Sequence, residues 1–480
     1  MMKKSISLLL CACTLLTTFA ACGGGKNNDP NTLNIVCLNK GYGDAWINTI
    51  ARKFESEHEG VKVDVNCSAK ADELIEKNLA SGYNTDDLYI CVGGEWKMSA
   101  IRGKFAQLDD IMDDEVDGVP LKEKVADEYE NSVYYPDSSG NKHTYRLPWT
   151  AGVGGIFYNT KMFETNGWTV PTTYAELATL CQTIVNDAVE VGDGSRTQVK
   201  PFVYTSANTD YFDYTVYTWW AQLAGVENVQ AFMQYESPDN FDTGKSATYA
   251  KLKEATKMLT DLFCNEAYVH EAESNHDAQK DFNNGYAAMM LNGEWIYNEI
   301  KGYQIDDEDF ELAVMKTPTA TGAVSDAIYT IGEDQYIAVP ASSTKQDLAK
   351  EFIKLLVSDF GCKTFIDQAN GLLAYDITTV TDGDISSITE DAFMRNLYSV
   401  KASYASAFTN YPDLTQMTNV RDHNAMIYLA NNVDVWGTGT MRPYRYIMDG
   451  TYTLDVAFSK IAQEVSSNWS DWQEKSGVNV

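Results

Sequence analysis

The chain has 480 residues, and its 68 acidic and 37 basic side chains give a formal net charge of −31 at pH 7. A chain this acidic lacks the basic surface with which proteins bind nucleic acid, so we expect no nucleic-acid partner. Its length exceeds what one simple hydrophobic core holds, which predicts two lobes or more.

The first 21 residues have the composition of a secretory signal peptide. Two lysines precede an uncharged, largely apolar run that is too short to be a confident membrane span. The run ends in Phe19-Ala20-Ala21-Cys22, which resembles the bacterial lipobox with Phe in place of the usual Leu. We therefore expect a lipid on Cys22, a flexible tether over residues 22–31, and attachment to the outer face of the cell membrane through the lipid alone. Ordinary signal-peptide cleavage beside a chance cysteine is the alternative.

After the tether, strand-like and helix-like segments alternate. Apolar runs predict the strands, and apolar residues at helical spacing predict the helices. The order β-α-β-α-β predicts parallel strands with right-handed crossovers. In chain order the predicted elements are a strand over 33–39, a helix over 44–60, a strand over 61–67, a helix over 71–81 and a strand within 86–94.

Two later helices carry a start signal. Thr173 with Glu176 forms a predicted capping box ahead of an apolar stripe, and Thr344 with Asp347 repeats the arrangement. These patterns indicate scaffold helices without chemistry of their own.

Six cysteines remain after the signal peptide and Cys22, and their spacings match no zinc pattern. Three lie in predicted strands, and one lies on the apolar face of a predicted helix. We expect free buried thiols rather than disulfides. The six are Cys37, Cys67, Cys91, Cys181, Cys264 and Cys362.

Three predicted strands are followed by an aromatic residue, a glycine turn and an acidic group. The segments are 39–44, 93–96 and 292–295. In open parallel sheets, ligands bind beyond the carboxyl ends of the strands. A lone tryptophan near a strand end is more often a core residue, but these neighbours favour a Trp295 that is displayed at a binding site. The run 287–291 predicts the buried strand before it, and Asn292-Gly293 predicts a turn.

Four segments, taken together and in this order, resemble the extracellular solute-binding proteins of ABC importers. They are similar to the carbohydrate-binding group of that family, which includes the maltose-binding protein. Residues 376–435 resemble no part of it. The segments are LNKGYGDAWINTIARKFESEHEGVKVDV, LPWTAGVGGIFYNTKMFETNGWTVPTTYAEL, GYAAMMLNGEWI and YIAVPASSTKQDLAKEFIKLLVSDFGCKTF.

This resemblance implies a two-lobed α/β fold of the periplasmic-binding-protein type. Each lobe would be a mostly parallel sheet flanked by helices, and several strands would form the hinge. Lobe one would comprise residues 31–155 plus 327–372, and lobe two residues 156–326 plus 373–480. The crossings would lie near 151–155, 325–335 and 370–376. The resemblance also implies a monomer that binds a carbohydrate and delivers it to an ABC permease.

A sugar site needs flat aromatic faces for the C–H patches of the rings and polar side chains for the hydroxyl groups. Aromatic residues make up 12% of this chain, including 10 Trp and 29 Tyr. Helical spacing assigns Trp46 to the core instead. The residues expected at the site are Trp295, Trp96 and Trp436, then Tyr42, Trp149, Tyr211 and Asp213, with Asn39, Asp44, Glu95, Glu294 and Arg442 as polar contacts.

Two other functions remain open. A secreted glycoside-acting enzyme would need paired carboxylates, which an acidic chain can supply, but the chain has no Gly-x-Ser-x-Gly or His-Glu-x-x-His motif. A binding protein for a polyamine would use acidic groups between aromatic rings, and Asp44, Glu95 and Glu294 suit one. Position twelve of the calcium-like stretch that begins at Asp113 is Lys124, where Glu is required. We expect a carrier rather than an enzyme, with no cofactor and no metal.

Overall fold

The computed structural model describes most of the chain. The residues described are 29–39, 41–81, 84–92, 99–100, 102–136, 141–192, 194–234, 236–301, 309–331, 334–377, 385–409 and 444–475.

A five-stranded sheet forms the centre of the first lobe, which we call lobe one. Its strand β1 (Thr32–Leu38), the second in the sheet order, pairs in parallel with both of its neighbours, which confirms the parallel strands predicted from the β-α-β-α-β order. All seven residues of that strand are buried, as expected for a strand covered by helices on both faces. In sheet order the strands are β2 (Lys62–Ser68), β1 (Thr32–Leu38), β3 (Leu88–Cys91), β15 (Tyr336–Ala338) and β8 (Leu147–Pro148).

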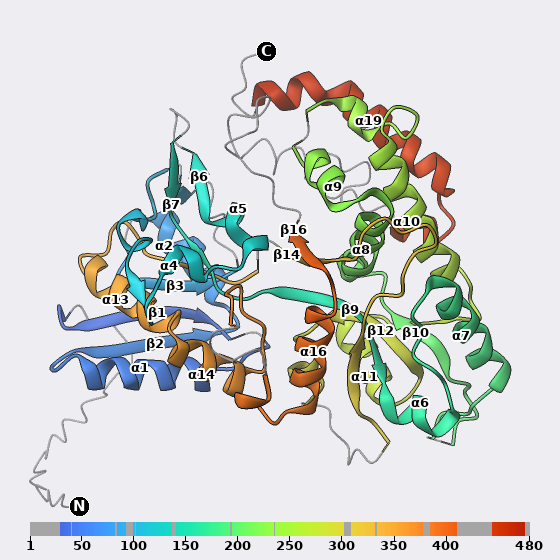
Figure 1. Ribbon diagram of the computed structural model, residues 1–480, viewed down its shortest axis with the longest axis horizontal. Coiled ribbons are helices and arrows are strands. Elements are labelled where there is room, and N and C mark those ends of the chain that lie inside the picture. Colours follow the sequence, from blue (N-terminus) through green and yellow to red (C-terminus); the bar gives the residue numbers. More distant parts are fainter. Residues whose placement is uncertain are drawn as a thin grey trace, which may run out of the picture.

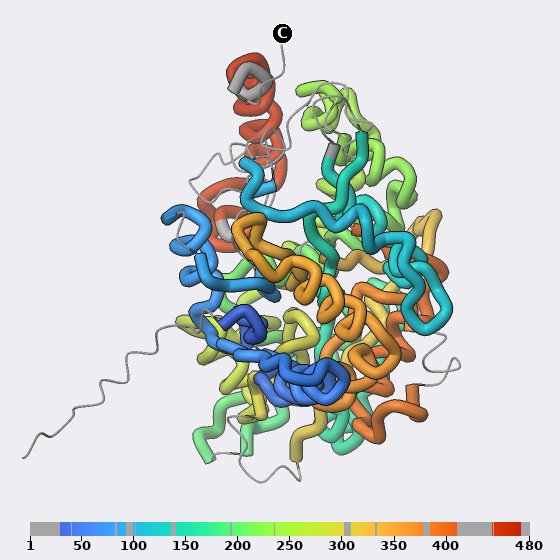
Figure 2. Tube along the Cα trace, turned by 90° about the vertical axis from the view of Figure 1, so that its left-hand side faces the viewer, coloured from blue at the N-terminus to red at the C-terminus, as the bar shows by residue number. Residues whose placement is uncertain are grey.

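Helices cover both faces of this sheet. In α1, Trp46, Ile50 and Phe54 are buried at the helical spacing that the sequence predicted. Helices from far along the chain pack against α1, and Figure 2 shows them (orange) beside it (blue). The helices of lobe one are α1 (Ala45–Glu57), α2 (Ala71–Ser81), α4 (Leu121–Lys124), α5 (Glu130–Val133), α13 (Gln346–Leu356) and α14 (Asp359–Ala369); two short hairpins pair β4 (Glu115–Val116) with β5 (Val119–Pro120) and β6 (Tyr134–Pro136) with β7 (Lys142–Thr144).

A seven-stranded mixed sheet forms the centre of lobe two. β9 pairs antiparallel with three strands, while β10 lies parallel to both of its neighbours. The sheet order is β11 (Val269–Glu271), β10 (Lys200–Tyr204), β12 (Ala287–Gly293), β9 (Gly152–Asn159), β14 (Ala327–Ile331) and β16 (Ser406–Thr409), with β13 (Leu312–Met315) also paired to β9.

The strand β12 is longer than the sequence predicted. Asn292 and Gly293 are its last two residues, paired with Gly155 and Gly154 of β9. The predicted turn at Asn292-Gly293 is therefore wrong, because tertiary pairing overrides a local turn signal. The chain leaves the strand at Glu294 and Trp295 instead.

The helices of lobe two surround this sheet. Figure 1 shows the C-terminal helix α19 (red) at the top of the lobe, and it packs against α10. In the described part of the chain, no helix combines the length and the apolar character needed to cross a bilayer. The helices are α6 (Thr160–Asn166), α7 (Tyr174–Asp187), α8 (Phe212–Ala224), α9 (Val226–Phe232), α10 (Ala247–Phe263), α11 (Asn275–Asn283), α12 (Ile296–Ile300), α16 (Ala392–Ala402), α18 (Tyr444–Met448) and α19 (Leu454–Lys475).

Only one of the two predicted helix caps is present. At α7 the Thr173 hydroxyl accepts a hydrogen bond from the Glu176 backbone N–H at 3.2 Å, and the Glu176 carboxylate accepts one from the Thr173 N–H at 3.1 Å, which confirms the capping box. At α13 the N-cap residue is Lys345 and makes no side-chain cap bond, so the cap predicted at Thr344 is wrong.

The chain passes between the two sheets at three places. Figure 1 shows β9 running from one half of the molecule toward the other. The first passage lies between β8 and β9, the second between β14 and β15, and the third follows residue 377. Three segments lie in the other lobe than the expected lobe boundaries gave them. Residues 152–155 and 327–331 pair in the sheet of lobe two. Residues 373–376 contact lobe one, for example through the hydrogen bond from the Ala126 N–H to the Ala374 carbonyl oxygen.

All six cysteines of the described chain are free thiols. Four are buried, in line with the expectation from the sequence, and Cys67 is partly buried. Cys264 is exposed at the end of α10, so the prediction of a buried thiol is wrong there.

Candidate ligand-binding site

The carboxyl ends of β1 and β12 meet at one buried carboxyl group. The Tyr42 hydroxyl, in the loop after β1, donates a hydrogen bond to Glu294 Oε1 at 2.9 Å. Glu294 Oε2 accepts another from the Val153 backbone N–H at 3.1 Å, and the Glu294 N–H donates to the Val153 carbonyl oxygen at 2.9 Å. One side chain therefore joins lobe one, lobe two and the hinge strand β9.

Glu294 is fully buried, and this burial is the main reason why its pKa is raised well above the ordinary value of a glutamate. The nearby Asp334 raises the pKa further. Burial and the proximity of Glu294 also raise the pKa of the Tyr42 hydroxyl. The surroundings of Glu294 therefore favour its protonated form more strongly than water does.

Asp334 lies in the second passage between the lobes, and the sequence analysis did not select it. The Thr150 hydroxyl donates a hydrogen bond to Asp334 Oδ2, and the Gln335 N–H donates to the Thr150 hydroxyl oxygen at 3.0 Å. These bonds join two of the segments that cross between the lobes, next to Glu294. The sequence near Asp334 gave no sign of this contact, because it depends on how the crossing segments are aligned with each other.

Two glycines permit the close approach of Trp295 to the backbone. Gly41 has φ +79°, and a Cβ atom added to it would lie 3.1 Å from the Cβ atom of Trp295. A Cβ atom on Gly293 would lie 2.4 Å from the indole ring of the same tryptophan. The indole therefore folds back over the end of its own strand, and a side chain at either glycine would displace it.

Two tyrosines of lobe two surround Trp295. Its indole N–H donates to the Tyr211 hydroxyl at 3.2 Å, and the ring centroids of the two residues lie 6.0 Å apart. Tyr214 meets the same indole edge to face, with centroids 6.3 Å apart. Trp295 itself is only partly buried, so part of its surface is open to a ligand. The sequence analysis missed Tyr214, although its three-residue spacing from Tyr211 is the available signal.

The Tyr214 side chain is 2% exposed, and its hydroxyl has no hydrogen-bond partner among the described residues. Burial raises the pKa of this hydroxyl, and Glu294 and Asp334 raise it further. A buried donor of this kind is costly unless something satisfies it. The arrangement offers binding chemistry, namely flat rings and hydroxyl donors, in the described part of the site.

Two other predicted site residues lie in the core. Trp149 is fully buried, stacked on Trp46 with ring centroids 5.4 Å apart and in edge contact with Phe365. Asp213 is 3% exposed and accepts a hydrogen bond from the Tyr444 hydroxyl at 3.2 Å. Neither side chain presents a free surface, so we leave both out of the proposed site.

Asn39 and Asp44 mark the two ends of the loop that carries Tyr42. The Asn39 carbonyl oxygen accepts a hydrogen bond from the Gly43 N–H at 3.0 Å, which closes the loop. Asp44 is exposed and precedes the first residue of α1. Five further predictions lie outside the described residues: Cys22, Glu95, Trp96, Trp436 and Arg442.

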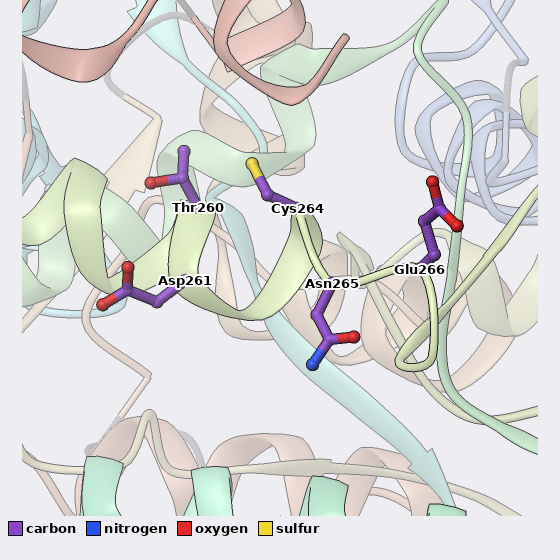
Figure 3. Close-up of a pocket in the computed structure, with 5 residues that line it drawn as sticks. All are labelled: Thr260, Asp261, Cys264, Asn265 and Glu266. Atoms are coloured by element: carbon purple, nitrogen blue, oxygen red, sulfur yellow. The ribbon is translucent and has the colours of Figure 1, made fainter. Parts of the chain in front are cut away.

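The described residues contain no group of three or more His, Cys, Asp or Glu side chains placed to hold a metal ion. Lys124 of the calcium-like stretch donates to Asp117 at 2.9 Å, so an ammonium group neutralises the acidic cluster there. A surface hollow of about 630 Å³ lies at the end of α10, lined by Thr260, Asp261, Cys264, Asn265 and Glu266 (Figure 3). None of those five residues was predicted to bind a ligand.

Comparison with known proteins identifies the family. The chain matches the family of bacterial extracellular solute-binding proteins over residues 40–359 and belongs to it. The matched region contains the strands of both sheets except β1 and β16, and Tyr42 and Glu294 both lie inside it.

Two curated relatives cover most of the chain. The multiple sugar-binding protein of Streptococcus mutans is 23% identical over 76% of this chain and 81% of its own length. The diacetylchitobiose binding protein DasA of Streptomyces coelicolor is 22% identical over 78% of this chain and 82% of its own.

The solved structures agree on the fold. A structure from work on xylan utilisation by the thermophilic bacterium Caldanaerobius polysaccharolyticus superposes with a TM-score of 0.65 at 17% identity, over 90% of this chain and all of the other. The two-lobed α/β fold class predicted from the sequence is therefore confirmed.

Proposed function

We propose that this protein is the substrate-binding component of an ABC importer, that it captures a carbohydrate between its two lobes, and that it delivers the sugar to a membrane permease. The observation that carries the proposal is the partly exposed Trp295, held beside Tyr211 where the ends of β1 and β12 meet. The sugar-binding names of both curated relatives support the same ligand class.

Trp295 and its neighbours have the chemistry that a sugar requires. The negative face of an indole attracts the weakly positive C–H patches of a pyranose ring, and hydroxyl or amide groups at the rim bind its hydroxyl groups. Tyr211 fixes the orientation of the indole through its hydrogen bond, so the ring has little conformational entropy left to lose when it stacks on a ligand.

Closure of the lobes would be the functional motion. A ligand favours the closed form only if it contacts both lobes, and moving the ratio of open to closed forms from 99:1 to 1:99 needs about 5.5 kcal/mol of differential affinity. Trp295 belongs to lobe two and lies against Gly41 of lobe one. A sugar stacked on the indole therefore lies close to the loop after β1.

The remaining parts of the proposal concern anchoring and assembly. Lipidation at Cys22 would hold the protein at the outer face of the membrane, and residues 22–31 would act as the tether. The protein would act as a monomer. It would carry its ligand rather than hydrolyse it, in line with its membership of a family of binding proteins.

A polyamine is the less favoured ligand. Glu294, one of the acidic groups that would attract an amine, is fully buried, and its two oxygens accept hydrogen bonds from Tyr42 and Val153. A buried carboxyl group whose two oxygens already accept hydrogen bonds inside the protein offers little to an ammonium group.

A thermal-shift screen of the purified protein tests the proposal. A ligand present at 100 times its dissociation constant stabilises the folded state by about 2.7 kcal/mol, which raises the melting temperature measurably. We expect a shift with one or more mono- or oligosaccharides and none with spermidine or putrescine. A shift with the polyamines alone would contradict the proposal. Release of reducing sugar when the protein is incubated with the same oligosaccharides would also contradict it, because a binding protein leaves its ligand intact.

A further inference from the structure

Two thiols lie side by side on neighbouring strands of lobe one. Cys37 of β1 and Cys67 of β2 are direct partners in the parallel register. Paired residues of parallel strands point to the same face of the sheet, and Cys67 packs against the same core as Cys37, on the side that α1 covers. The proximity of Cys67, ahead of burial, is the largest cause of the raised pKa of the Cys37 thiol. The Cys37 thiol itself donates a weak hydrogen bond to the Leu38 carbonyl oxygen at 3.7 Å.

The spacing of the strands brings the pair within reach of a covalent bond. Neighbouring strands lie about 4.7–4.9 Å apart, which falls inside the range of about 4.4–6.8 Å between Cα atoms in disulfides. The Cβ atoms of such partners are separated by a similar distance, slightly more than the usual 3.5–4.5 Å or so. A bond formed here is therefore strained, and strained disulfides are readily reduced again.

The two thiols differ in access. Cys37 is fully buried, whereas Cys67 is partly exposed. An oxidant from solution therefore meets Cys67 first, and the thiolate form of Cys37 can then attack the neighbouring sulfur of Cys67. Because the pKa of Cys37 is raised, this second step is faster at alkaline pH than at neutral pH.

We propose that Cys37 and Cys67 form a reversible disulfide by exchange with a small-molecule disulfide oxidant. In the first step the Cys67 sulfur attacks one sulfur of the oxidant, which releases one small thiol and leaves a mixed disulfide. In the second step the Cys37 sulfur attacks Cys67 and releases the second small thiol. Both thiol hydrogens of the protein end on the two released small thiols, so the oxidant is reduced as the pair is oxidised.

The bond reaches the loop that carries Tyr42. In the dithiol form the Cys67 thiol donates a weak hydrogen bond to the Gly43 carbonyl oxygen at 3.7 Å. Oxidation removes that donor hydrogen. The loop after β1 therefore loses one of its contacts when the disulfide forms. This inference depends on the geometry of lobe one and holds whatever the ligand is.

The test uses the full chain with Cys264→Ser, which removes the exposed thiol of the described residues. The reduced protein is incubated with oxidised glutathione, alkylated and mapped by mass spectrometry. We expect a linked peptide pair that contains Cys37 and Cys67 and has lost two hydrogen atoms, and we expect dithiothreitol to restore both thiols.

Three variants resolve the order of the steps. With Cys37→Ser, Cys67 is expected to accumulate as the mixed disulfide with glutathione. With Cys67→Ser, Cys37 is expected to remain a free thiol. Cys181 is a buried thiol on α7, so Cys181→Ser is the matched control. We expect the linked pair to form in this variant as in the parent chain. If the parent chain keeps both thiols free, or holds glutathione on Cys67 without forming the linked pair, the proposal is overturned.

Discussion

The Tyr42 hydroxyl and the Glu294 carboxyl group, 252 positions apart in the chain, form a buried hydrogen bond of 2.9 Å between the two lobes. The other oxygen of the carboxyl group is bound to the hinge strand through the Val153 N–H. The protein itself therefore makes the contacts between the lobes next to the hinge. A ligand that drives closure has to make its differential contacts farther out, on the partly exposed side of Trp295.

The first prediction concerns this bond. Tyr42→Phe removes the hydroxyl donor and leaves one oxygen of a buried carboxyl group without its partner. We expect the free energy of unfolding to fall by about 1–3 kcal/mol, measured by urea denaturation, because the desolvation of that oxygen is no longer compensated.

Tyr375→Phe is the matched control for this measurement. Tyr375 is also a buried tyrosine of the described chain, but its hydroxyl has no hydrogen-bond partner among the described residues. Its removal should cost little. Equal losses of stability in the two variants would show that the Tyr42–Glu294 bond contributes nothing specific.

The second prediction concerns pH. The pKa of Glu294 in the folded protein lies above its ordinary value of 4.5, mainly because the group is buried. The folded state therefore holds a proton that the unfolded state releases as pH rises past that value. The stability linked to this proton is fully present below the unfolded pKa and is lost as pH rises through the folded pKa.

Glu294→Gln isolates this effect, because the amide stays neutral at every pH. We expect the free energy of unfolding of the variant, relative to that of the parent protein, to increase as pH rises from 5 to 8 in urea titrations. The many other acidic groups contribute equally to both proteins and cancel in the difference. A difference that stays constant with pH would indicate that Glu294 titrates normally in the fold.

Much of the fold could be predicted from the sequence because the signals were local. Strand β1 is a short segment rich in apolar residues, and α1 buries Trp46, Ile50 and Phe54 at the spacing that helix geometry requires. The Thr173 capping box needs only three residues of separation, and it is present. Such patterns hold because each element buries one face whatever the rest of the chain does.

The site was harder to predict because its contacts join distant parts of the chain. Asp213 is buried by a bond to Tyr444, 231 positions away, and Trp149 is buried by its stack on Trp46. The acidic character of Glu294 suggested an exposed ligand contact. In the structure its carboxyl group is buried and joins the two lobes through the hydrogen bond with Tyr42. The structure places Trp295 and Tyr211, which the sequence proposed as ligand contacts, next to this junction. Asp334 could not be selected because its position depends on how the crossing segments pair.

The third prediction compares the two helix caps. Thr173→Ala should lower the free energy of unfolding by about 1 kcal/mol, because the Glu176 N–H loses its acceptor at the start of α7. Thr344→Ala should have almost no effect, since the Thr344 side chain makes no cap bond to α13. Chemical denaturation of both variants decides this. A loss at Thr344 as large as that at Thr173 would contradict the assignment of the caps.

The fourth prediction tests the role of Trp295 with whichever sugar the thermal-shift screen selects. Trp295→Ala should weaken binding tenfold or more in isothermal titration calorimetry, equivalent to about 1.4 kcal/mol or more, because the stacking surface is lost. The melting temperature should fall only slightly, since the indole is partly exposed and its polar and aromatic partners are the rings of Tyr211 and Tyr214. Trp149→Phe is the matched control, because Trp149 stacks on Trp46 in the core. This substitution should lower the melting temperature and leave the dissociation constant unchanged. If Trp295→Ala lowers the melting temperature strongly while the dissociation constant stays unchanged, the indole is a core residue and the proposed site is wrong.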